Sequence, residues 1–354
     1  MIQDFERFVQ RGYSGLRWTT ARSISRPVSE QLCRLETAHV LAVFRQACNL
    51  VTAAGDVIAV VLPPVGDGPL NIVIEGKAGL FTPLDVGTVV RMEGTHLRIG
   101  DLGVELGCAT PWEPHPDWNE LRSRRADIAA RLPLLHDLCQ RCAPEDSLLT
   151  LLYEPSGDHP PSLLAARISS TARTAIHLLT MEKGKDDARL RASVEQLAGL
   201  GNGLTPAGDD LLVGGMIGLW LFHPTPERLG RTIVEVAVPR TTTLSAAFLR
   251  AAARGECSAD WHRLLTALSH APDRIAAAVQ HLLAHGATSG ADGLAGFLLS
   301  GSLCAAAAGR TSGTIPVAAA PPPTPRPSAR PGPCESPASP SGESRPGPSC
   351  CARE

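Results

Sequence analysis

Short apolar segments separated by turn residues fill the first third of the chain. Many of their residues are β-branched, and Gly, Asp and Pro separate the segments TAHVLAVFRQACNLV, GDVIAVVLP, LNIVIEG, TVVRMEG, HLRIG and VELG. β-Branched residues favour strands and the separating residues favour turns. The pattern therefore predicts a small antiparallel β domain over residues 35–116. The polar residues 1–34 before it have weak periodicity and are expected to form a weakly ordered leader.

After Pro116 the apolar residues recur three or four positions apart, which is the spacing of a helix with a buried face. Helix starts and breaks separate the segments 118–142, 162–181, 187–199, 209–223, 226–237, 242–254, 259–268, 272–285 and 290–308. We expect a larger all-helical domain over residues 117–310, and hence the α+β class. Residues 311–354 are rich in proline and poor in large apolar residues, so they predict a disordered tail.

Composition narrows the choice of partners. Lys and Arg (33) nearly balance Asp and Glu (35), so no nucleic-acid or membrane surface is expected. The longest apolar runs, 211–222 and 294–308, are shorter than the roughly 18–20 residues of a membrane span. The scattered cysteines and the absence of a signal-peptide pattern predict a cytoplasmic protein with free thiols. Small molecules and other proteins are the expected partners.

The stretch GLGNGLTPAGDDLLVGG (199–215) carries the most unusual chemistry. Thr205 and Pro206 are typical of an N-cap and a first helical residue. Alternating glycines before them allow positive φ, and a glycine-rich loop ahead of a helix attracts anions. No lysine follows the glycines and no strand precedes them, which excludes the common nucleotide-binding loops. The stretch predicts either an anion-binding loop or a well-capped helix start.

Two aspartates open this helix. Consecutive helical residues point about 100° apart, so Asp209 and Asp210 cannot face the same way. We expect one carboxylate to brace the loop and the other to face whatever the loop encloses.

A second segment, HGATSGADGLAG (285–296), is similar to the first. When Thr288 is aligned with Thr205, Asp292 falls on Asp209. The alternative interpretation is a capping box of Ser289 and Asp292. We hypothesise that the two helix starts meet and hold one polar or anionic ligand. The residues expected to bind it are Gly201, Asn202, Gly203, Thr205, Gly208, Asp209, Asp210, Thr288, Ser289, Gly290 and Asp292.

Five further residues are secondary candidates for the same site. They are Asn71, Arg240, Thr242, Ser245 and His285. Each has a simpler interpretation, because Thr and Ser often cap helices, Arg is common on surfaces, Asn71 follows a turn and His285 lies near a helix end. Cys139 and Cys142 form a lone CxxC pair, but no second pair or His cluster completes a zinc site, so both are expected to be packing residues. No catalytic residue can be named.

The run GNGLTPAGDDL (201–211), with the Thr-rich residues 241–245 and the sequence TSGAD (288–292), resembles the AllH-like family. That family includes a subunit of bacterial oxamate carbamoyltransferase, and its hallmark is a GLTPSGDD-like box. Here Ala207 replaces the usual serine, which removes one hydroxyl donor. The resemblance covers roughly residues 35–308. It implies partner subunits and a place in allantoin-derived nitrogen metabolism, where carbamoyl-oxamate gives oxamate and carbamoyl phosphate.

Three functions are compatible with the sequence. The first is a cytoplasmic subunit of a carbamoyltransferase assembly that needs no cofactor and binds a small carboxylate, carbamoyl or phosphate group at the paired helix starts. The second is a non-catalytic scaffold or regulatory subunit. The third is a stand-alone enzyme that uses Mg²⁺ held by Asp209 and Asp210.

Overall fold

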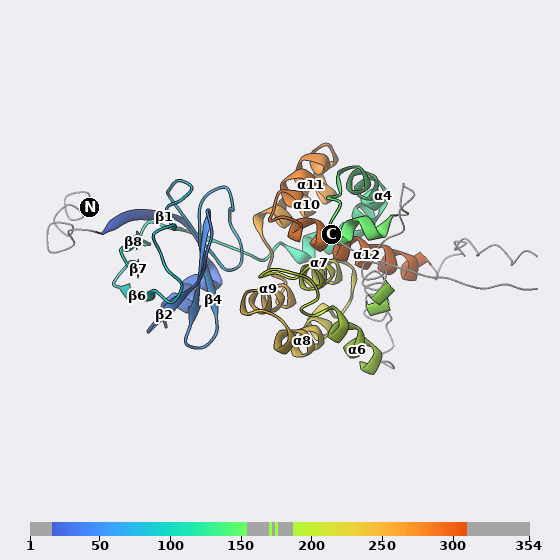
Figure 1. Cartoon of the computed structure of the whole chain (residues 1–354). Helices are drawn as coiled ribbons and strands as arrows, with labels where there is room; N and C mark the ends of the chain where they lie inside the picture. Colours follow the sequence, from blue (N-terminus) through green and yellow to red (C-terminus); the bar gives the residue numbers. More distant parts are fainter. Residues whose placement is uncertain (1–15, 154–169, 172–173, 176–186, 310–354) are drawn as a thin grey trace, which may run out of the picture. The chain divides into compact units, whose positions relative to one another are not determined.

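The computed structural model describes residues 16–153, 170–171, 174–175 and 187–309 (Figure 1). The tail predicted over 311–354 and most of the helix predicted over 162–181 lie outside these residues.

The N-terminal part of the described chain is a closed β-barrel. Its strands are β1 (Arg17–Ser25), β2 (Ala38–Val43), β3 (Ala47–Thr52), β4 (Val57–Val61), β5 (Asn71–Ile74), β6 (Val89–Glu93), β7 (His96–Ile99) and β8 (Leu102–Glu105). They pair in the order β5-β4-β3-β2-β6-β7-β8-β1, and β1 pairs again with β5 to close the ring. A short further strand, β9 (Thr110–Trp112), pairs with the end of β1.

The prediction of a small antiparallel β domain is therefore wrong. β1 runs parallel to β8 over Arg17–Thr20 and antiparallel to β5 over Ala21–Ile24, with a register shift between Ala21 and Ser23. β4 and β5 are also parallel. Parallel pairs join strands that no tight hairpin connects, so turn residues give no sign of them. β1 itself lies within residues 1–34, which were expected to form the leader. The strand was missed because its polar sequence RWTTARSIS lacks the regular alternation of a half-buried strand.

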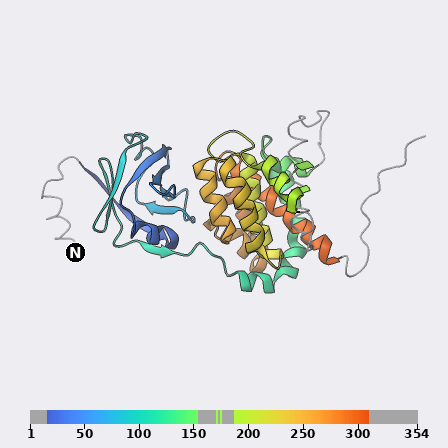
Figure 2. The same cartoon turned by 90° about the horizontal axis from the view of Figure 1, so that it is seen from below.

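A short helix, α2 (Arg26–Leu32), follows β1 directly and lies beside the barrel strands (Figure 2). Pro27 lies in its first turn, where a missing N–H does no harm. Val28 and Leu32 point into the barrel core, which they share with Phe81 and the inward residues of the strands. The segment expected to be a weakly ordered leader thus supplies part of the core of the barrel.

The second part of the described chain is helical, as predicted. Its elements are α3 (Trp118–Ser123), α4 (Arg125–Cys142), η1 (Leu148–Leu152), α6 (Asp187–Leu197), α7 (Ala207–Phe222), α8 (Pro226–Ala237), η2 (Val238–Arg240), α9 (Thr243–Ala253), α10 (Ala259–His270), η3 (Pro272–Arg274), α11 (Ile275–Leu283) and α12 (Ser289–Gly309). No helix in the described ranges combines the length and apolar character that crossing a bilayer requires.

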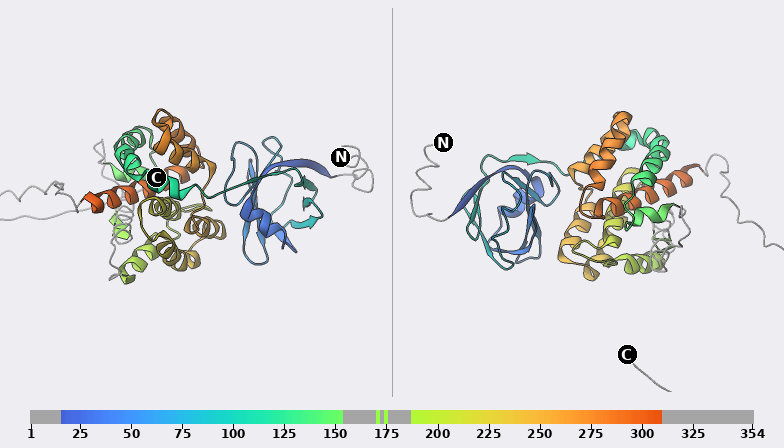
Figure 3. Two further views of the ribbon diagram at one scale, coloured as in Figure 1. Left: turned by 180° about the vertical axis from the view of Figure 1, so that it is seen from behind. Right: turned by 45° about the horizontal axis from the view of Figure 1, so that its top comes forward.

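Helices α7 and α12 form the centre of this part (Figure 3). α6, α8 and α9 contact α7, whereas α4 and α11 contact α12. Both central helices are rich in apolar residues on every side, which is typical of helices buried in a core.

Glycines bring the backbones of these two helices into direct contact. A Cβ atom added at Gly214 would overlap the carbonyl oxygen of Gly293, and one added at Gly296 would overlap that of Leu211. Further along, Gly218 packs against Ser300, whose hydroxyl donates to the carbonyl of Gly215 at 3.0 Å. No larger residue fits at Gly214 or Gly296 unless the helices separate.

The barrel and the helices share a small apolar cluster. Residues of β4, β5 and the loop between them pack against Leu244 and Ala247 of α9. Two backbone hydrogen bonds add to this contact: Ala259 N–H donates to the carbonyl of Asp67 at 3.0 Å, and Cys257 N–H donates to that of Pro114 at 2.9 Å.

Replacing Gly214 by Ala should destabilise the chain by roughly 3 kcal/mol or more, because the new methyl group collides with backbone that cannot rotate away. The matched control is Gly215→Ala, whose Cβ would lie 3.6 Å from Ser300 Oγ, an ordinary contact distance. That substitution should change the free energy of unfolding by no more than about 1 kcal/mol. Urea denaturation of both variants measures their free energies of unfolding. Equal losses in the two variants would contradict the proposed backbone contact.

Candidate functional site

The glycine-rich loop before α7 is fixed by its neighbours. Gly199, Gly201 and Gly203 have φ values of 69°, 126° and 99°, as the alternating glycines predict. Thr242, the N-cap of α9, accepts the N–H of Ser245 and donates its hydroxyl to the carbonyl of Leu204. The loop is therefore held against the start of α9.

Asp209 is the carboxylate that braces this loop. Its side chain is buried, accepts the N–H of Gly199 at 2.9 Å and accepts the hydroxyl of Thr241. Burial raises the pKa of Asp209, and these hydrogen bonds offset part of the rise because they favour the charged form. Both carboxylate oxygens are thus engaged within the protein.

The start of α12 has the same organisation. Asp292 is fully buried and accepts the N–H of Leu148, the first residue of η1, at 2.6 Å. Burial raises the pKa of Asp292 to about 6, although this bond and the Thr288 hydroxyl favour the charged form. The residue aligned with Asp209 therefore has the same task, which is to fix a neighbouring backbone segment.

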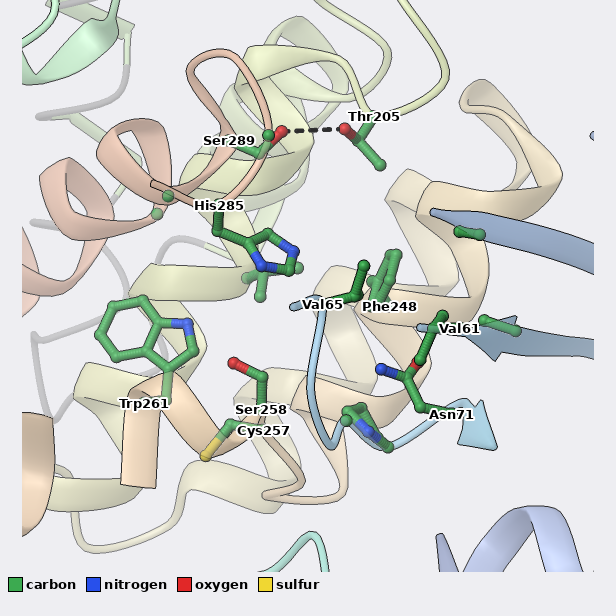
Figure 4. Close-up of a pocket in the computed structure, with 18 of the residues that line it drawn as sticks. Val61, Val65, Asn71, Thr205, Phe248, Cys257, Ser258, Trp261, His285 and Ser289 are labelled. Atoms are coloured by element: carbon green, nitrogen blue, oxygen red, sulfur yellow. Dashed lines mark hydrogen bonds between the residues drawn. The ribbon is translucent and has the colours of Figure 1, made fainter. Parts of the chain in front are cut away.

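The two look-alike helix starts meet, as the sequence hypothesis predicts. Thr205 Oγ1 and Ser289 Oγ are 3.0 Å apart and share a hydrogen bond (Figure 4). The prediction that Thr205 caps α7 is wrong, because α7 begins at Ala207 after Pro206 and the Thr205 hydroxyl reaches across to the other loop. The close packing of α7 on α12 explains this, since it brings both helix starts to one place.

Thr205 and Ser289 line a cavity of about 390 Å³. Asp210, which interacts with both hydroxyls, also lines the cavity, as do Gly290 and Gly293. His285 and Trp261 form part of the wall on this side (Figure 4). The opposite wall comes from the barrel and includes Asn71. The cavity therefore lies where the paired helix starts face the barrel.

Asp210 is the carboxylate left at the cavity. Its Oδ2 atom is shielded from solvent and accepts no hydrogen bond from the described residues. Burial raises the pKa of Asp210 to about 7, and the charges of Asp292 and Asp209 add to the rise, whereas the Ser289 and Thr205 hydroxyls oppose it. Near neutral pH this group holds its proton part of the time.

None of the described residues that line the cavity is a lysine or an arginine. Its acidic lining residues are Asp67, Asp210 and Glu256, and Arg254 pairs with the Glu256 carboxylate at 2.6 and 2.8 Å. His285 lies 3.9 Å from the Asp260 carboxylate. The cavity thus offers hydroxyls and carboxylate oxygens without a fixed cation.

The backbone amides at the start of α7 are also engaged. Gly208 N–H donates to the carbonyl of Leu200 at 2.9 Å, and Asp209 and Asp210 N–H both donate to that of Pro206. Gly290 N–H at the start of α12 donates to the carbonyl of His285 at 3.1 Å. These four amides therefore do not form an open anion cradle.

Two family models match this sequence. Residues 20–111, which include most of the barrel, match the AllH family N-terminal domain, and residues 197–301 match oxamate carbamoyltransferase subunit AllH. Together the matches cover more than half of the chain. The chain belongs to the AllH family. No solved structure matches it.

Within this AllH-family chain the predicted site residues other than Arg240 fall into three groups. Thr205, Asp210, Ser289, Gly290, His285 and Asn71 line the cavity. Gly208, Asp209, Thr242, Ser245, Thr288 and Asp292 support the surrounding loops and helix starts. Gly201, Asn202 and Gly203 are exposed and do not line the cavity.

Arg240 is directed elsewhere. Its guanidinium pairs with Glu195 at 2.7 Å and donates to the carbonyl of Val236, so it links α6 to the end of α8. It is absent from the cavity lining. Its backbone matters more for the loop, since the Arg240 carbonyl lies where a Cβ on Gly199 would be.

Sequence reasoning missed the segment ECSADW (256–261), which supplies Glu256, Cys257, Ser258 and Trp261 to the cavity. The only sign of this segment in the sequence was a helix start with polar and aromatic residues, and that helix start resembles neither of the two glycine-containing loops. Trp261 also packs on the bare backbone of Gly293, from which a Cβ would lie 3.3 Å away.

The raised pKa of Asp210 predicts how stability depends on pH. The folded state keeps this proton up to about pH 7, whereas the unfolded chain releases it near pH 4, so this group lowers the free energy of unfolding as pH rises between those values. Asp210→Asn removes this contribution. Between pH 4 and pH 7, the free energy of unfolding of the variant minus that of the unchanged chain should therefore rise by up to about 1.4 kcal/mol per pH unit.

Urea denaturation at pH 5, 6 and 7 measures this difference, with Asp85→Asn at an exposed barrel turn as the control. Parallel curves for the unchanged chain and Asp210→Asn would refute the raised pKa of Asp210.

Proposed function

We propose that this chain is the AllH-type subunit of a cytoplasmic carbamoyltransferase assembly and that it holds a small carbamoyl-bearing ligand between its two glycine-containing loops. The observation that carries the proposal is the hydrogen bond between Thr205 and Ser289 at one end of the cavity. Membership of a family described as an oxamate carbamoyltransferase subunit supports the assembly role.

Among carboxylate, phosphate and carbamoyl groups, the chemistry of the cavity favours the carbamoyl group. A phosphate usually needs a cation or free amides, whereas this lining has no lysine or arginine among its described residues and four of the helix-start amides are engaged. A carbamoyl group offers N–H donors and one carbonyl acceptor. Asp210 can accept from its nitrogen. Its oxygen can accept from both Thr205 and Ser289 when it replaces the hydrogen bond that these two hydroxyls share in the unliganded chain.

The same hydroxyls suit the chemistry of transfer. Attack on a carbamoyl carbon develops negative charge on its oxygen, and fixed donors that face this oxygen lower the barrier. In this proposal the chain binds and orients the carbamoyl group, and partner subunits supply the remaining reactants.

The scaffold alternative retains some support, because Asp209 and Asp292 both brace neighbouring backbone. The magnesium alternative loses its premise that Asp209 and Asp210 act together. Both oxygens of Asp209 are engaged by Gly199 and Thr241, and only Asp210 of the two lines the cavity.

Calorimetric titration of the purified chain with oxamate tests the proposal. Oxamate carries the same amide group and should bind, whereas inorganic phosphate should not. Ser289→Ala removes one donor and should weaken oxamate binding about 5- to 10-fold, since one hydrogen bond contributes roughly 1 kcal/mol or slightly more.

The matched control is Ser123→Ala, an exposed serine on α3 that does not line the cavity. Absence of oxamate binding, or equal binding by Ser289→Ala, would contradict the proposed site. If the chain binds no oxamate but is still required for turnover by the assembled subunits, the scaffold alternative holds.

A further inference from the structure

The cavity has two ends of different chemistry. The polar end carries Thr205, Ser289, Asp210 and His285. The barrel side is walled mainly by apolar side chains, namely Phe44, Val61 and Val65 of the barrel and Phe248 of α9. Val213 and Ile217 of α7 also line the cavity. Figure 4 shows Val61, Val65 and Phe248 together, across the cavity from Trp261.

The polar side chains near the apolar wall are three neutral amides and the carboxylate of Asp67, which already accepts the hydroxyl of Ser23. Gln46, Asn49 and Asn71 come from the barrel, and the Asn71 amide already donates to the carbonyl of Gly66 at 2.8 Å. The apolar end therefore has few groups to hold a second charged or strongly polar part of a ligand.

The volume is too large for the carbamoyl group alone. A cavity of about 390 Å³ falls within the range of roughly 300–1,000 Å³ that accommodates drug-sized ligands. Oxamate has only a few heavy atoms, so it would leave most of the apolar wall in contact with water. Burying that wall is favourable, at about 0.8 kcal/mol for each methylene group of a ligand, or about fourfold in affinity.

We infer that this cavity binds an amide or ureido compound with an apolar aliphatic or aromatic body, the carbamoyl or amide head at Thr205 and Ser289 and the body against Val61, Val65 and Phe248. The inference rests on the proposed function for the placement of the head. It adds the substrate class, which is larger and more apolar than oxamate.

A series of N-substituted oxamates tests the inference by calorimetric titration of the full chain. Oxamate, N-methyl-, N-ethyl- and N-butyl-oxamate share one head and differ only in the body. Affinity should rise about fourfold per added methylene until the body fills the apolar end. N-Phenyl-oxamate should bind tighter than oxamate by a similar cumulative factor.

A variant that fills the apolar end tests the contribution of the ligand's body to binding separately from that of its head. Ala47 lines the cavity at the start of β3 and is only partly buried, so Ala47→Leu adds a side chain to open space. N-Butyl-oxamate should bind this variant at least tenfold more weakly than it binds the unchanged chain, and oxamate should bind both equally. The matched control is Ala53→Leu, in the exposed turn at the other end of β3.

The two proposals fail in different ways. If oxamate binds but affinity does not rise along the series, or if Ala47→Leu binds N-butyl-oxamate like the unchanged chain, the inference is wrong and the proposed function stands. If affinity rises along the series but Ser289→Ala has no effect on any member, the head does not lie at Ser289 and both proposals are overturned. Thermal unfolding of each variant confirms that it is folded.

Discussion

The direct contact between the backbones of α7 and α12 is the constraint on which the site depends. Gly214 faces Gly293, and Gly296 faces the Leu211 carbonyl, so the helix axes approach more closely than side chains would allow. Because both contacts lie within two to three turns of the helix starts, they also fix the loops that precede the helices. The Thr205–Ser289 hydrogen bond is a consequence of that approach.

The same packing assigns different tasks to three similar carboxylates. Burying a charged group is unfavourable unless hydrogen bonds compensate for lost water. Asp209 and Asp292 each receive a backbone N–H from a distant segment, so they contribute to the architecture. Asp210 lies near both other acids, its shielded Oδ2 has no partner among the described residues, and its pKa, raised to about 7, is higher than that of Asp292. A ligand bound in the cavity would therefore change the protonation of Asp210 more than that of Asp209 or Asp292.

The sequence predicted the helical part and the meeting of the two helix starts, because internal similarity and helical periodicity are local signals. It also predicted that Asp209 and Asp210 diverge, since that follows from helix geometry. It assigned Thr205 to the wrong task, because a hydroxyl before a proline looks like a cap whether or not a partner approaches from another helix. Closure of the barrel depends on β1, whose pairings are long-range and partly parallel. Of the barrel wall of the cavity, only Asn71 was a candidate from the sequence. The rest of that wall, from Phe44 to Pro69, follows from the closure and gave no sign in the sequence.

The central claim is that both loops bind one ligand, and the most direct measurement is a crystal structure of the chain with N-phenyl-oxamate. The account predicts the amide oxygen within about 3.2 Å of both Thr205 Oγ1 and Ser289 Oγ. The ring should contact Val65 and Phe248. A ligand that contacts only one of the two loops, or that binds outside the cavity, would contradict it.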